Sequence, residues 1–530
     1  MRTESDIKQN SLINVSQQIP SVSADLQAGC DMSNLRSMFF VVGFLVYLIS
    51  QGAAEPCFLA AKGSPTFPAN FSFGVATAAY QIEGGWNADG KGPSIWDDFT
   101  HKNPDKIRDK SSGDVAADSY HRFDQDLQAL KELKVDHYRF SIAWSRIYPT
   151  GDISSKNQKG IDYYNNVIDK LIANRIEPVV TMFHYDLPSE VQKIGGFANS
   201  LLVNQFVVYA IELFENYGDR VKTWITFNEP YDYCQNGYGD ASYPPQVYAP
   251  GVADYLCIDN TLKAHAATYH SYKSRFAKTQ GGRLGITLDS RFFFSRTNDE
   301  DIVDRGMQYG LGILAHPIFS KSGGYPDIMI MDIGANSQKE GRIRSRLPSF
   351  KNKWRDIVRG SADFLGLNYY SSRYIKRASK PNGVSPSWER DMDCDTSIDS
   401  NWLRAKSDWL YCVPEGLEGI LKFIRDEYDN VEVMITENGW SDDGELIDDN
   451  RIRYLRSHLQ AVLNAINDGC KISAYTHWSL IDNFEWLKGY TEKFGLYAVN
   501  MSSPNRERTA KKSAGYYKQI IESRKIPSIF

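Results

Sequence analysis

Two glutamates, each standing at the end of an apolar run, are the residues of this sequence best suited to do chemistry. Glu229 follows the run 222–228, and Glu437 ends the run 432–437. Both runs have the length and β-branched content of strands buried on two faces, so each carboxylate would lie at the rim of a parallel sheet. Two carboxylates that share a pocket suit glycoside hydrolysis, because one protonates the leaving oxygen while the other meets the positive charge that develops at the sugar carbon.

Eight apolar runs alternate with amphipathic stretches and would position these glutamates. The runs lie near 71–79, 137–144, 176–183, 222–228, 284–289, 363–369, 432–437 and 472–478. Apolar residues recur at helical spacing in three of the stretches between them, 123–133, 161–172 and 452–466. This order predicts an α/β fold made of a single (β/α)8 TIM barrel over residues 66–523, with long loops at the C-terminal face of the strands. A doubly wound open sheet is the alternative, but no glycine-rich phosphate loop follows an early strand.

Composition and charge argue against a nucleic-acid partner. The chain has 530 residues with 60 basic and 65 acidic side chains, so its net charge of −5 creates no broad field that favours nucleic acid or an anionic membrane. Aromatic residues make up 13% of the chain, and although most must pack the core, they also suit a pocket for the apolar faces of a sugar. A small neutral molecule is the expected partner, and the oligomeric state stays open.

The first 65 residues differ from the rest of the chain. Met38 to Ile49 is a continuous apolar run, preceded by Arg36 and followed by small residues at 52–54. This run has the length of a secretory signal and is too short to span a bilayer, so we expect a cleaved signal at 32–54 and a secreted protein with no membrane span after cleavage. The alternative is a signal-anchored membrane protein. Residues 1–31 form a polar extension, either untranslated, with Met32 as the true start, or disordered.

The cysteines and glycosylation motifs agree with an oxidising compartment. None of the seven cysteines forms a CxxC or a Cys/His cluster, so we expect no metal site and no cofactor. Within loops, the candidate disulfide pairs are Cys234 with Cys257 and Cys394 with Cys412, although spacing alone does not decide between pairings. Asn70 and Asn500 begin the acceptor pattern for N-glycosylation.

Several motifs, in a fixed order, carry a resemblance to a known family. They are FSFGVATAAYQIEG (71–84), GKGPSIWDDF (90–99), YRFSIAWSRI (138–147), FHYDLP (183–188), TFNEP (226–230), FLGLNYY (364–370), ITENG (435–439) and WSLIDNFEW (478–486). Together they resemble glycoside hydrolase family 1, the retaining β-glucosidases, over about residues 67–521. Within this family the sequence is most similar in character to secreted arthropod-type members. The resemblance implies a glycosidase that forms a covalent glycosyl-enzyme intermediate and acts on a small-molecule glycoside.

The resemblance also implies a role for each matching residue. Glu229 would be the general acid/base and Glu437 the nucleophile, with Arg139 keeping the nucleophile ionised and Tyr370, together with Asn368, orienting it. The remaining family positions would form a cradle for one sugar ring: Gln81, His184, Asn228 and Glu485 as hydrogen-bonding groups, and Trp478, Trp486 and Phe494 as apolar walls. Each has a structural alternative, since Arg139 would also suit a buried ion pair, His184 a core histidine, and the three aromatic residues the core.

Two positions depart from the family pattern. Tyr185 stands where the family usually carries Trp, which puts the shape of the pocket wall in doubt, and His477 should point away from the pocket if Trp478 faces it. Three functions remain open: a β-glucosidase with galactosides or fucosides as further candidate substrates, a myrosinase acting on glucosinolates, and a catalytically inactive sugar-binding barrel. The inactive barrel is disfavoured because such relatives usually lose one glutamate, and this chain has both.

Overall fold

The computed structural model describes residues 57–350, 353–379 and 385–527. The predicted polar extension at 1–31 and the predicted signal at 32–54 lie outside these residues. Residues 56–530 form one compact unit, and the predicted barrel lies within it.

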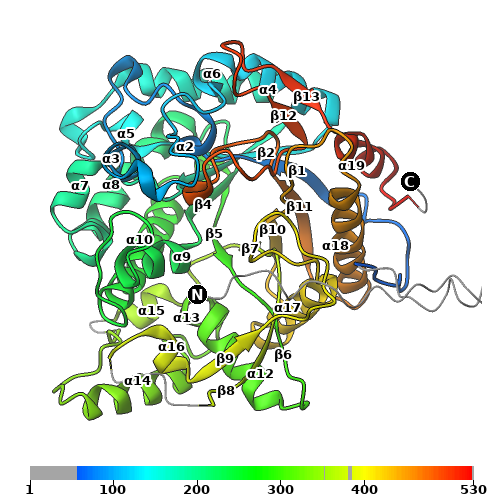
Figure 1. Cartoon of the computed structure of the whole chain (residues 1–530). Helices are drawn as coiled ribbons and strands as arrows, with labels where there is room; N and C mark the ends of the chain where they lie inside the picture. Colours follow the sequence, from blue (N-terminus) through cyan, green and yellow to red (C-terminus); the bar gives the residue numbers. More distant parts are fainter. Residues whose placement is uncertain (1–56, 351–352, 380–384, 528–530) are drawn as a thin grey trace, which may run out of the picture. The chain divides into compact units, whose positions relative to one another are not determined.

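Eight parallel strands close into a barrel at the centre of this unit (Figure 1). Each pairs with its neighbours in chain order, and β1 closes the ring by pairing with both β2 and β11. The alternative of an open doubly wound sheet is therefore wrong, and the predicted barrel is confirmed. The strands are β1 (Ser72–Ala76), β2 (His137–Ser141), β3 (Glu177–Phe183), β4 (Thr223–Asn228), β5 (Arg283–Asp289), β7 (Leu365–Asn368), β10 (Val433–Asn438) and β11 (Ile472–Trp478).

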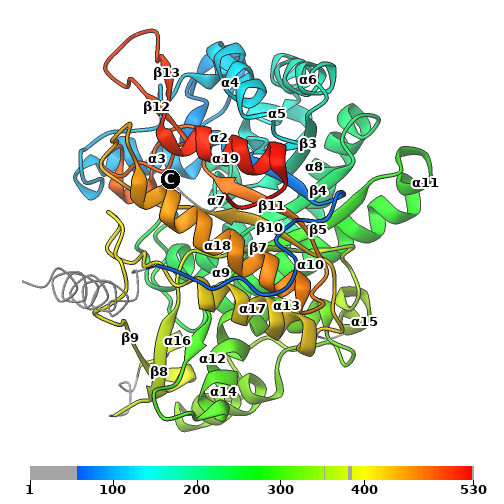
Figure 2. The ribbon, with the colours of Figure 1, turned by 90° about the vertical axis from the view of Figure 1, so that its right-hand side faces the viewer.

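Long helices surround the barrel and cover the outer faces of its strands (Figure 1). In Figure 2, α19, α18 and α17 run side by side across it. The three helices predicted from spacing fall within α4, α6 and α18. The long helices are α4 (Ser119–Leu133), α6 (Gln158–Ala173), α8 (Leu202–Tyr217), α10 (Ala253–Arg275), α14 (Asp327–Lys339), α17 (Pro414–Glu427), α18 (Asp449–Asn467) and α19 (Lys512–Ser523).

Short elements occupy the connections. The short helices are α2 (Ala79–Ile82), α3 (Ile95–Lys102), α5 (Trp144–Ile147), α7 (Ser189–Lys193), α9 (Pro230–Cys234), α11 (Ala277–Gln280), α12 (Glu300–Met307), α13 (Ile313–Phe319), α15 (Trp354–Val358) and α16 (Trp388–Met392). Two small sheets accompany them, one of β6 (Phe293–Phe294), β8 (Arg373–Arg377) and β9 (Cys394–Ser397), the other of β12 (Tyr497–Val499) and β13 (Arg508–Ala510).

Apolar side chains fill the barrel on both sides of its wall. A small cluster formed by strands β3, β4, β10 and β11 and the start of β7 is fully buried: Val179, Ile225, Phe364, Met434 and Ala474. Outside the wall, aromatic residues of β4 pack on α8, with ring centroids 4.3 Å apart for Phe227 and Phe206. Burial on both faces explains why the strands read as continuous apolar runs.

Two disulfide bonds join distant parts of the chain. Cys234 pairs with Cys257 as predicted, and Cys57 pairs with Cys412, 355 residues away. The expected alternative of Cys394 with Cys412 is wrong, because Cys394 is a buried free thiol whose Sγ donates to the Met392 carbonyl. Across the part of the chain that the structure describes, no helix combines the length and apolar character needed to cross a bilayer.

Candidate active site

Glu229 stands one residue beyond the end of β4, where the chain turns sharply. Its backbone is left-handed, with φ of 44°, and its amide donates to the Thr287 carbonyl of β5 at 2.9 Å. Pro230 follows as the first residue of α9, a position where its missing N–H breaks no helical hydrogen bond. Positive φ is strained for a residue other than glycine, and here it accompanies a side chain that lines the cavity at the barrel mouth.

Glu437 is the second-last residue of β10. Arg139 of β2 donates to its Oε1 at 2.6 Å, and the Tyr370 hydroxyl donates to its Oε2 at 2.8 Å. Arg139 is 1% exposed, and it also donates to Thr181 Oγ1, the Thr436 carbonyl and Asn228 Oδ1. A rigid guanidinium and a hydroxyl thus hold both oxygens of Glu437 in place.

Both strands are irregular where they approach their glutamates. The pairing of β4 with β5 shifts register between Ile225 and Asn228, and the pairing of β10 with β7 shifts between Ile435 and Glu437. Irregularities of this kind interrupt the strict alternation of side chains and re-aim the residues that follow. They explain how side chains at the end of each strand reach the mouth although the preceding residues pack the core.

The carboxyl group of Glu229 accepts one hydrogen bond on each oxygen. Asn368 of β7 donates to Oε1 and the Tyr185 hydroxyl donates to Oε2, both at 2.6 Å. Burial raises the pKa of Glu229 well above its usual value, and the negative charge of Glu437 raises it further, with smaller contributions from Asp289 and Asp232. The Tyr185 hydrogen bond lowers the pKa but does not cancel these effects.

One hydrogen-bond network joins the two glutamates. Asn228 Oδ1 accepts from Arg139, the partner of Glu437, at 2.6 Å and from Asn368, the partner of Glu229, at 3.1 Å. Both glutamates also line a single cavity of about 390 Å³, within the usual size range of small-ligand pockets. The structure therefore brings together the two carboxylates that the sequence singled out.

The polar residues expected to bind a sugar divide into two groups. Gln81, His184 and Glu485 line the cavity, and two of them have a buried polar atom with no partner among the described residues, Gln81 Oε1 and His184 Nδ1. Such atoms need a partner, and a sugar hydroxyl would provide one. Asn228 is 1% exposed and lies behind the cavity lining, where its amide contacts His184 Nε2 at 3.3 Å. It belongs to the network that supports the site.

The pKa values of two cavity residues, Glu485 and His184, are shifted in opposite directions. Burial raises the pKa of Glu485 well above its usual value, and the nearby charges of Glu492 and Glu437 add to the effect. Burial lowers the pKa of His184 well below its usual value, with a contribution from Arg139. A neutral carboxyl group and a neutral imidazole each offer one donor and one or more acceptors, which suits hydroxyl groups better than ions.

The three predicted aromatic residues serve both the core and the cavity. Trp478, Trp486 and Phe494 are at most 9% exposed, yet each contributes to the cavity lining. Trp478 stacks on the His184 ring with centroids 5.9 Å apart. His477 lies outside the lining, with its ring 5.9 Å from the Tyr517 ring of α19, as alternation along β11 predicts.

The outer part of the cavity contains residues that sequence reasoning missed. They come mainly from the loops after β4, β5 and β11: Asp232, Asn236, Tyr243, Asp289, Arg291, Lys488 and Glu492. Asp289 is the last residue of β5, so the rule that singled out Glu437 at a strand end also applies to it. The others lie in the connections that follow the strands, Asp232 within α9, and the resemblance implied no role for any of them.

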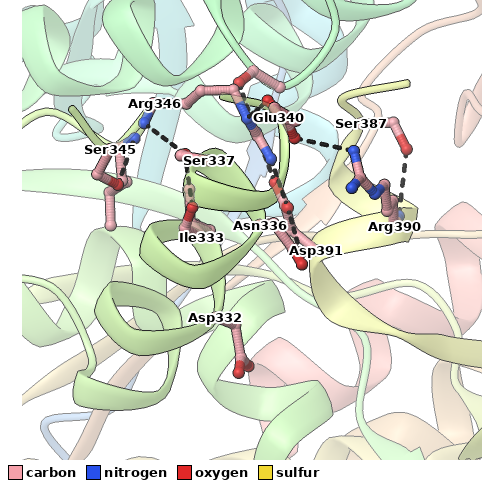
Figure 3. Close-up of polar contacts among 12 residues, drawn as sticks. Asp332, Ile333, Asn336, Ser337, Glu340, Ser345, Arg346, Ser387, Arg390 and Asp391 are labelled. Atoms are coloured by element: carbon pink, nitrogen blue, oxygen red, sulfur yellow. Dashed lines mark hydrogen bonds and ion pairs between the residues drawn. The ribbon is translucent and has the colours of Figure 1, made fainter. Parts of the chain in front are cut away.

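A buried ion-pair cluster supports the wall beside Glu229. Trp388 of α16 packs on Tyr231 of α9 with ring centroids 4.8 Å apart. Behind it, Arg346 binds both oxygens of Asp391, at 2.7 and 2.8 Å, and also contacts Glu340 of the segment that follows α14 (Figure 3). The Arg346 and Asp391 side chains are 1% and 0% exposed, so this pair holds α16 from a fully desolvated position.

Metal-ligating side chains do not cluster in the same way. Among the residues described, no group of three or more His, Cys, Asp or Glu side chains is arranged to hold a metal ion.

A closed parallel barrel with paired carboxyl groups at its mouth defines a class of (β/α)8 enzymes that act on sugars. The model of glycosyl hydrolase family 1 matches residues 64–526. Myrosinase 1 of Brevicoryne brassicae is 43% identical over 87% of this chain and 99% of its own length, and human cytosolic beta-glucosidase is 40% identical over 86% and 98%.

Solved structures agree with this match. An aphid myrosinase superposes with a TM-score of 0.83 at 42% identity, covering 87% of this chain and 100% of its own. A mutant rice beta-glucosidase, solved in a covalent complex with glucose, superposes with a TM-score of 0.81 at 36% identity, covering 86% and 99%. The chain belongs to glycoside hydrolase family 1, and it is a glycoside hydrolase.

Proposed function

We propose that this enzyme is a retaining β-glucosidase in which Glu437 is the nucleophile and Glu229 the general acid/base. The observation that carries the proposal is the contrast between the two carboxyl groups of one cavity. Arg139 and Tyr370 bind Glu437 as donors, whereas burial and the charge of Glu437 favour a proton on Glu229. Environments that differ in this way separate a nucleophile from an acid.

The reaction proceeds in two displacements. Glu437 attacks the anomeric carbon and forms a C–O bond to it, while the bond to the leaving oxygen breaks and that oxygen takes the proton of Glu229. Once Glu437 is esterified, its negative charge is gone, so Glu229 becomes a carboxylate that accepts a proton from water. The water oxygen then bonds to the anomeric carbon, and the electron pair of the ester bond returns to Glu437.

The inner part of the cavity supports glucose as the bound sugar. Gln81, His184 and Glu485 offer donors and acceptors to its hydroxyl groups, and Trp478 offers an apolar face. Arg139, Asn228 and Asn368 act through the glutamates that they orient. The covalent glucose complex of the rice relative agrees with a glycosyl-enzyme intermediate.

Azide rescue tests the two roles against each other. Replacing Glu437 by Gly should reduce turnover of an aryl β-glucoside by several orders of magnitude, and azide should then enter from the face that Glu437 occupied, yielding α-glucosyl azide. The matched control is Glu229→Ala, in which azide attacks the glycosyl-enzyme from the opposite face and yields the β-azide. Nuclear magnetic resonance of the products reads the configuration. Near wild-type turnover in Glu437→Gly would remove this residue from the nucleophile role.

A myrosinase activity is the second candidate, because two of the similar proteins carry that name. Glu229 can protonate an oxygen leaving group, and hydrolysis of O-glucosides needs this protonation. Assaying purified enzyme on a panel of aryl β-glucosides and glucosinolates separates the two activities. Binding of glucose without hydrolysis of either class would instead favour an inactive sugar-binding barrel.

We also propose that the protein is secreted after removal of a signal at 32–54. Two disulfide bonds support an oxidising compartment, where such bonds persist. Asn70 and Asn500 are both exposed, as glycan attachment requires. The proposed mature chain begins shortly after residue 54 and includes the whole barrel.

A further inference from the structure

Tyr185 is held rigidly at the position where family members usually carry Trp. It follows β3 with a left-handed backbone, φ of 73°, and is 3% exposed. Its ring lies 6.0 Å from the Tyr233 ring, nearly parallel, and 5.2 Å from Trp486. Packing on these two neighbours fixes the direction of the hydroxyl, which reaches Glu229 Oε2 at 2.6 Å.

The two oxygens of Glu229 have partners of different capability. Asn368 Oδ1 accepts from Thr436 Oγ1 at 2.7 Å, which turns the amide nitrogen toward Glu229 Oε1. An amide nitrogen only donates, so Oε1 cannot direct a proton at Asn368. The Tyr185 hydroxyl either donates or accepts, so it can bond to Oε2 both when that oxygen carries the proton and when it does not, while Asn368 donates to Oε1 in both states.

We propose that Tyr185 is a positioning residue for the acid/base: its hydroxyl accepts from protonated Glu229 and donates to the Glu229 carboxylate, keeping one carboxyl orientation through both displacements. This inference rests on the proposed role of Glu229. In the first displacement the Glu229 O–H turns from the Tyr185 oxygen to the leaving oxygen, this O–H bond breaks as the leaving group is protonated, and the Tyr185 O–H rotates to donate to the carboxylate that results. In the second displacement Glu229 takes a proton from water, and Tyr185 itself gains and loses no proton. Burial and the charge of Glu229 raise the pKa of Tyr185 well above its usual value, so it remains a phenol.

The charged groups around Glu229 define what the test must hold constant. Glu437 from β10, Asp289 from β5 and Asp232 from α9 raise its pKa. The pKa values of the Tyr370 and Tyr243 hydroxyls are raised by burial and, to a smaller extent, by the charge of Glu229. Replacing Tyr185 by Phe removes one hydroxyl and leaves all of these groups in place. A donor to a carboxylate favours the ionised form, so its loss should raise the pKa of Glu229.

The experiment compares pH profiles of kcat/KM for an activated aryl glucoside. In Tyr185→Phe we expect the alkaline limb to move up by about 0.5 to 1 pH unit, the difference between the charge-assisted hydrogen bond to the carboxylate and the weaker neutral one to the carboxylic acid. With a poor leaving group, kcat should fall about tenfold, because the acid is less well oriented. Tyr233→Phe is the matched control: it removes the neighbouring hydroxyl, which contacts Tyr238 at 3.3 Å, and should leave the limb unmoved.

The outcomes separate this inference from the proposed function. If Glu229→Ala abolishes the alkaline limb but Tyr185→Phe leaves it in place, the role of Tyr185 is overturned and that of Glu229 stands. If the limb persists in Glu229→Ala, the acid/base assignment fails, and this inference fails with it. A lower melting temperature in Tyr185→Phe without movement of the limb would reduce Tyr185 to a packing residue.

Discussion

Glu229 and Glu437 are chemically identical side chains, and their surroundings make them different. Glu437 is bound by Arg139, whereas Glu229 accepts only from neutral donors and stands close to three other carboxyl groups. Because the charge of Glu437 helps to keep the proton on Glu229, the esterification of one changes the acidity of the other. In the mechanism that we propose, this coupling would let Glu229 serve as acid and then as base.

Leaving-group dependence tests the acid role of Glu229. Replacing it by Ala should reduce kcat/KM of alkyl or poorly activated glucosides by about two to four orders of magnitude, because these need protonation of the leaving oxygen. Dinitrophenyl glucosides, whose leaving groups are stable anions, should lose far less in the first displacement. Steady-state assays across leaving groups of graded acidity measure the slope. Equal losses for all substrates would contradict an acid role.

The raised pKa of Glu229 also predicts a dependence of stability on pH. A carboxyl group whose pKa is higher in the folded than in the unfolded state stabilises the fold most below the unfolded value of about 4.3, and this stabilisation is lost as pH rises through the folded value. Glu229→Gln removes the ionisation, so the variant should melt at a higher temperature than wild type at pH 8 and at a similar temperature at pH 4.

Glu212 provides a control of opposite sign for this measurement. Burial acts to raise its pKa, but hydrogen bonds from Lys156, Tyr148 and Asn216 lower it below the usual value. Its stabilising contribution is therefore present at neutral pH and is lost as pH falls. Glu212→Gln should melt below wild type at pH 8, with a difference that shrinks toward pH 4. The same sign for both variants would contradict the assigned electrostatics.

At the scale of elements, the residues of the site are positioned by the ends of the barrel strands and by the helices outside them. Arg139 of β2 and Asn368 of β7 reach between strands to orient the glutamates of β10 and of the turn after β4. Trp388 of α16 packs against Tyr231 of α9, which lies two residues after Glu229 in the chain. The Arg346–Asp391 ion pair thus connects to α9, the helix that begins directly after Glu229, through the packing of Trp388 on Tyr231.

Breaking that ion pair should destabilise the protein strongly. Asp391→Ala removes the bidentate carboxylate of the buried Arg346 guanidinium and leaves it only Glu340 as an acidic partner, and removing one partner of a buried pair costs about 3–5 kcal/mol of the free energy of unfolding. Urea titration measures the loss. Asp426→Ala on α17 is the control, because it breaks an exposed pair with Arg425 and should change stability little. Equal effects of the two substitutions would show that the pair does not anchor α16.

At the scale of the whole molecule, the barrel forms one body closed by bonds between sequence-distant parts. The Cys57–Cys412 disulfide and the pairing of β1 with β11 both join the beginning of the described chain to its later half. The disulfide, together with the exposed acceptor asparagines, supports the proposed export.

The mature N-terminus tests the proposed export. Expressed in insect cells, the full chain should appear in the medium with an N-terminus shortly after residue 54, measured by N-terminal sequencing, and enzymatic deglycosylation should lower its mass. Leu45→Arg, which interrupts the apolar run, should keep the protein in the cells. Retention of the wild-type chain in the membrane fraction, with residues 32–54 intact, would favour the signal anchor instead.

Much of the fold was predictable because both faces of each strand are buried. The eight apolar runs correspond to the eight barrel strands with boundaries a few residues off, because the ends of such runs include flanking residues, like those after β1 at 77–78 and the first residue of α2. The glutamates were identifiable from strand-end position and motif, and so was the Cys234–Cys257 pair. The Cys57–Cys412 bond was not, because residues 355 apart carry no local signal of proximity.

The sequence by itself determined the barrel, the pair of carboxylates and the membership of the family, because periodicity and strand-end motifs are local properties of the chain. Only the tertiary structure decided that Arg139 reaches Glu437, that Asn228 lies behind the cavity, and that Tyr185 contacts Glu229. These contacts depend on irregular strand pairing and left-handed turns, which re-aim side chains by angles that no residue pattern encodes. They connect residues that become neighbours only when the barrel closes.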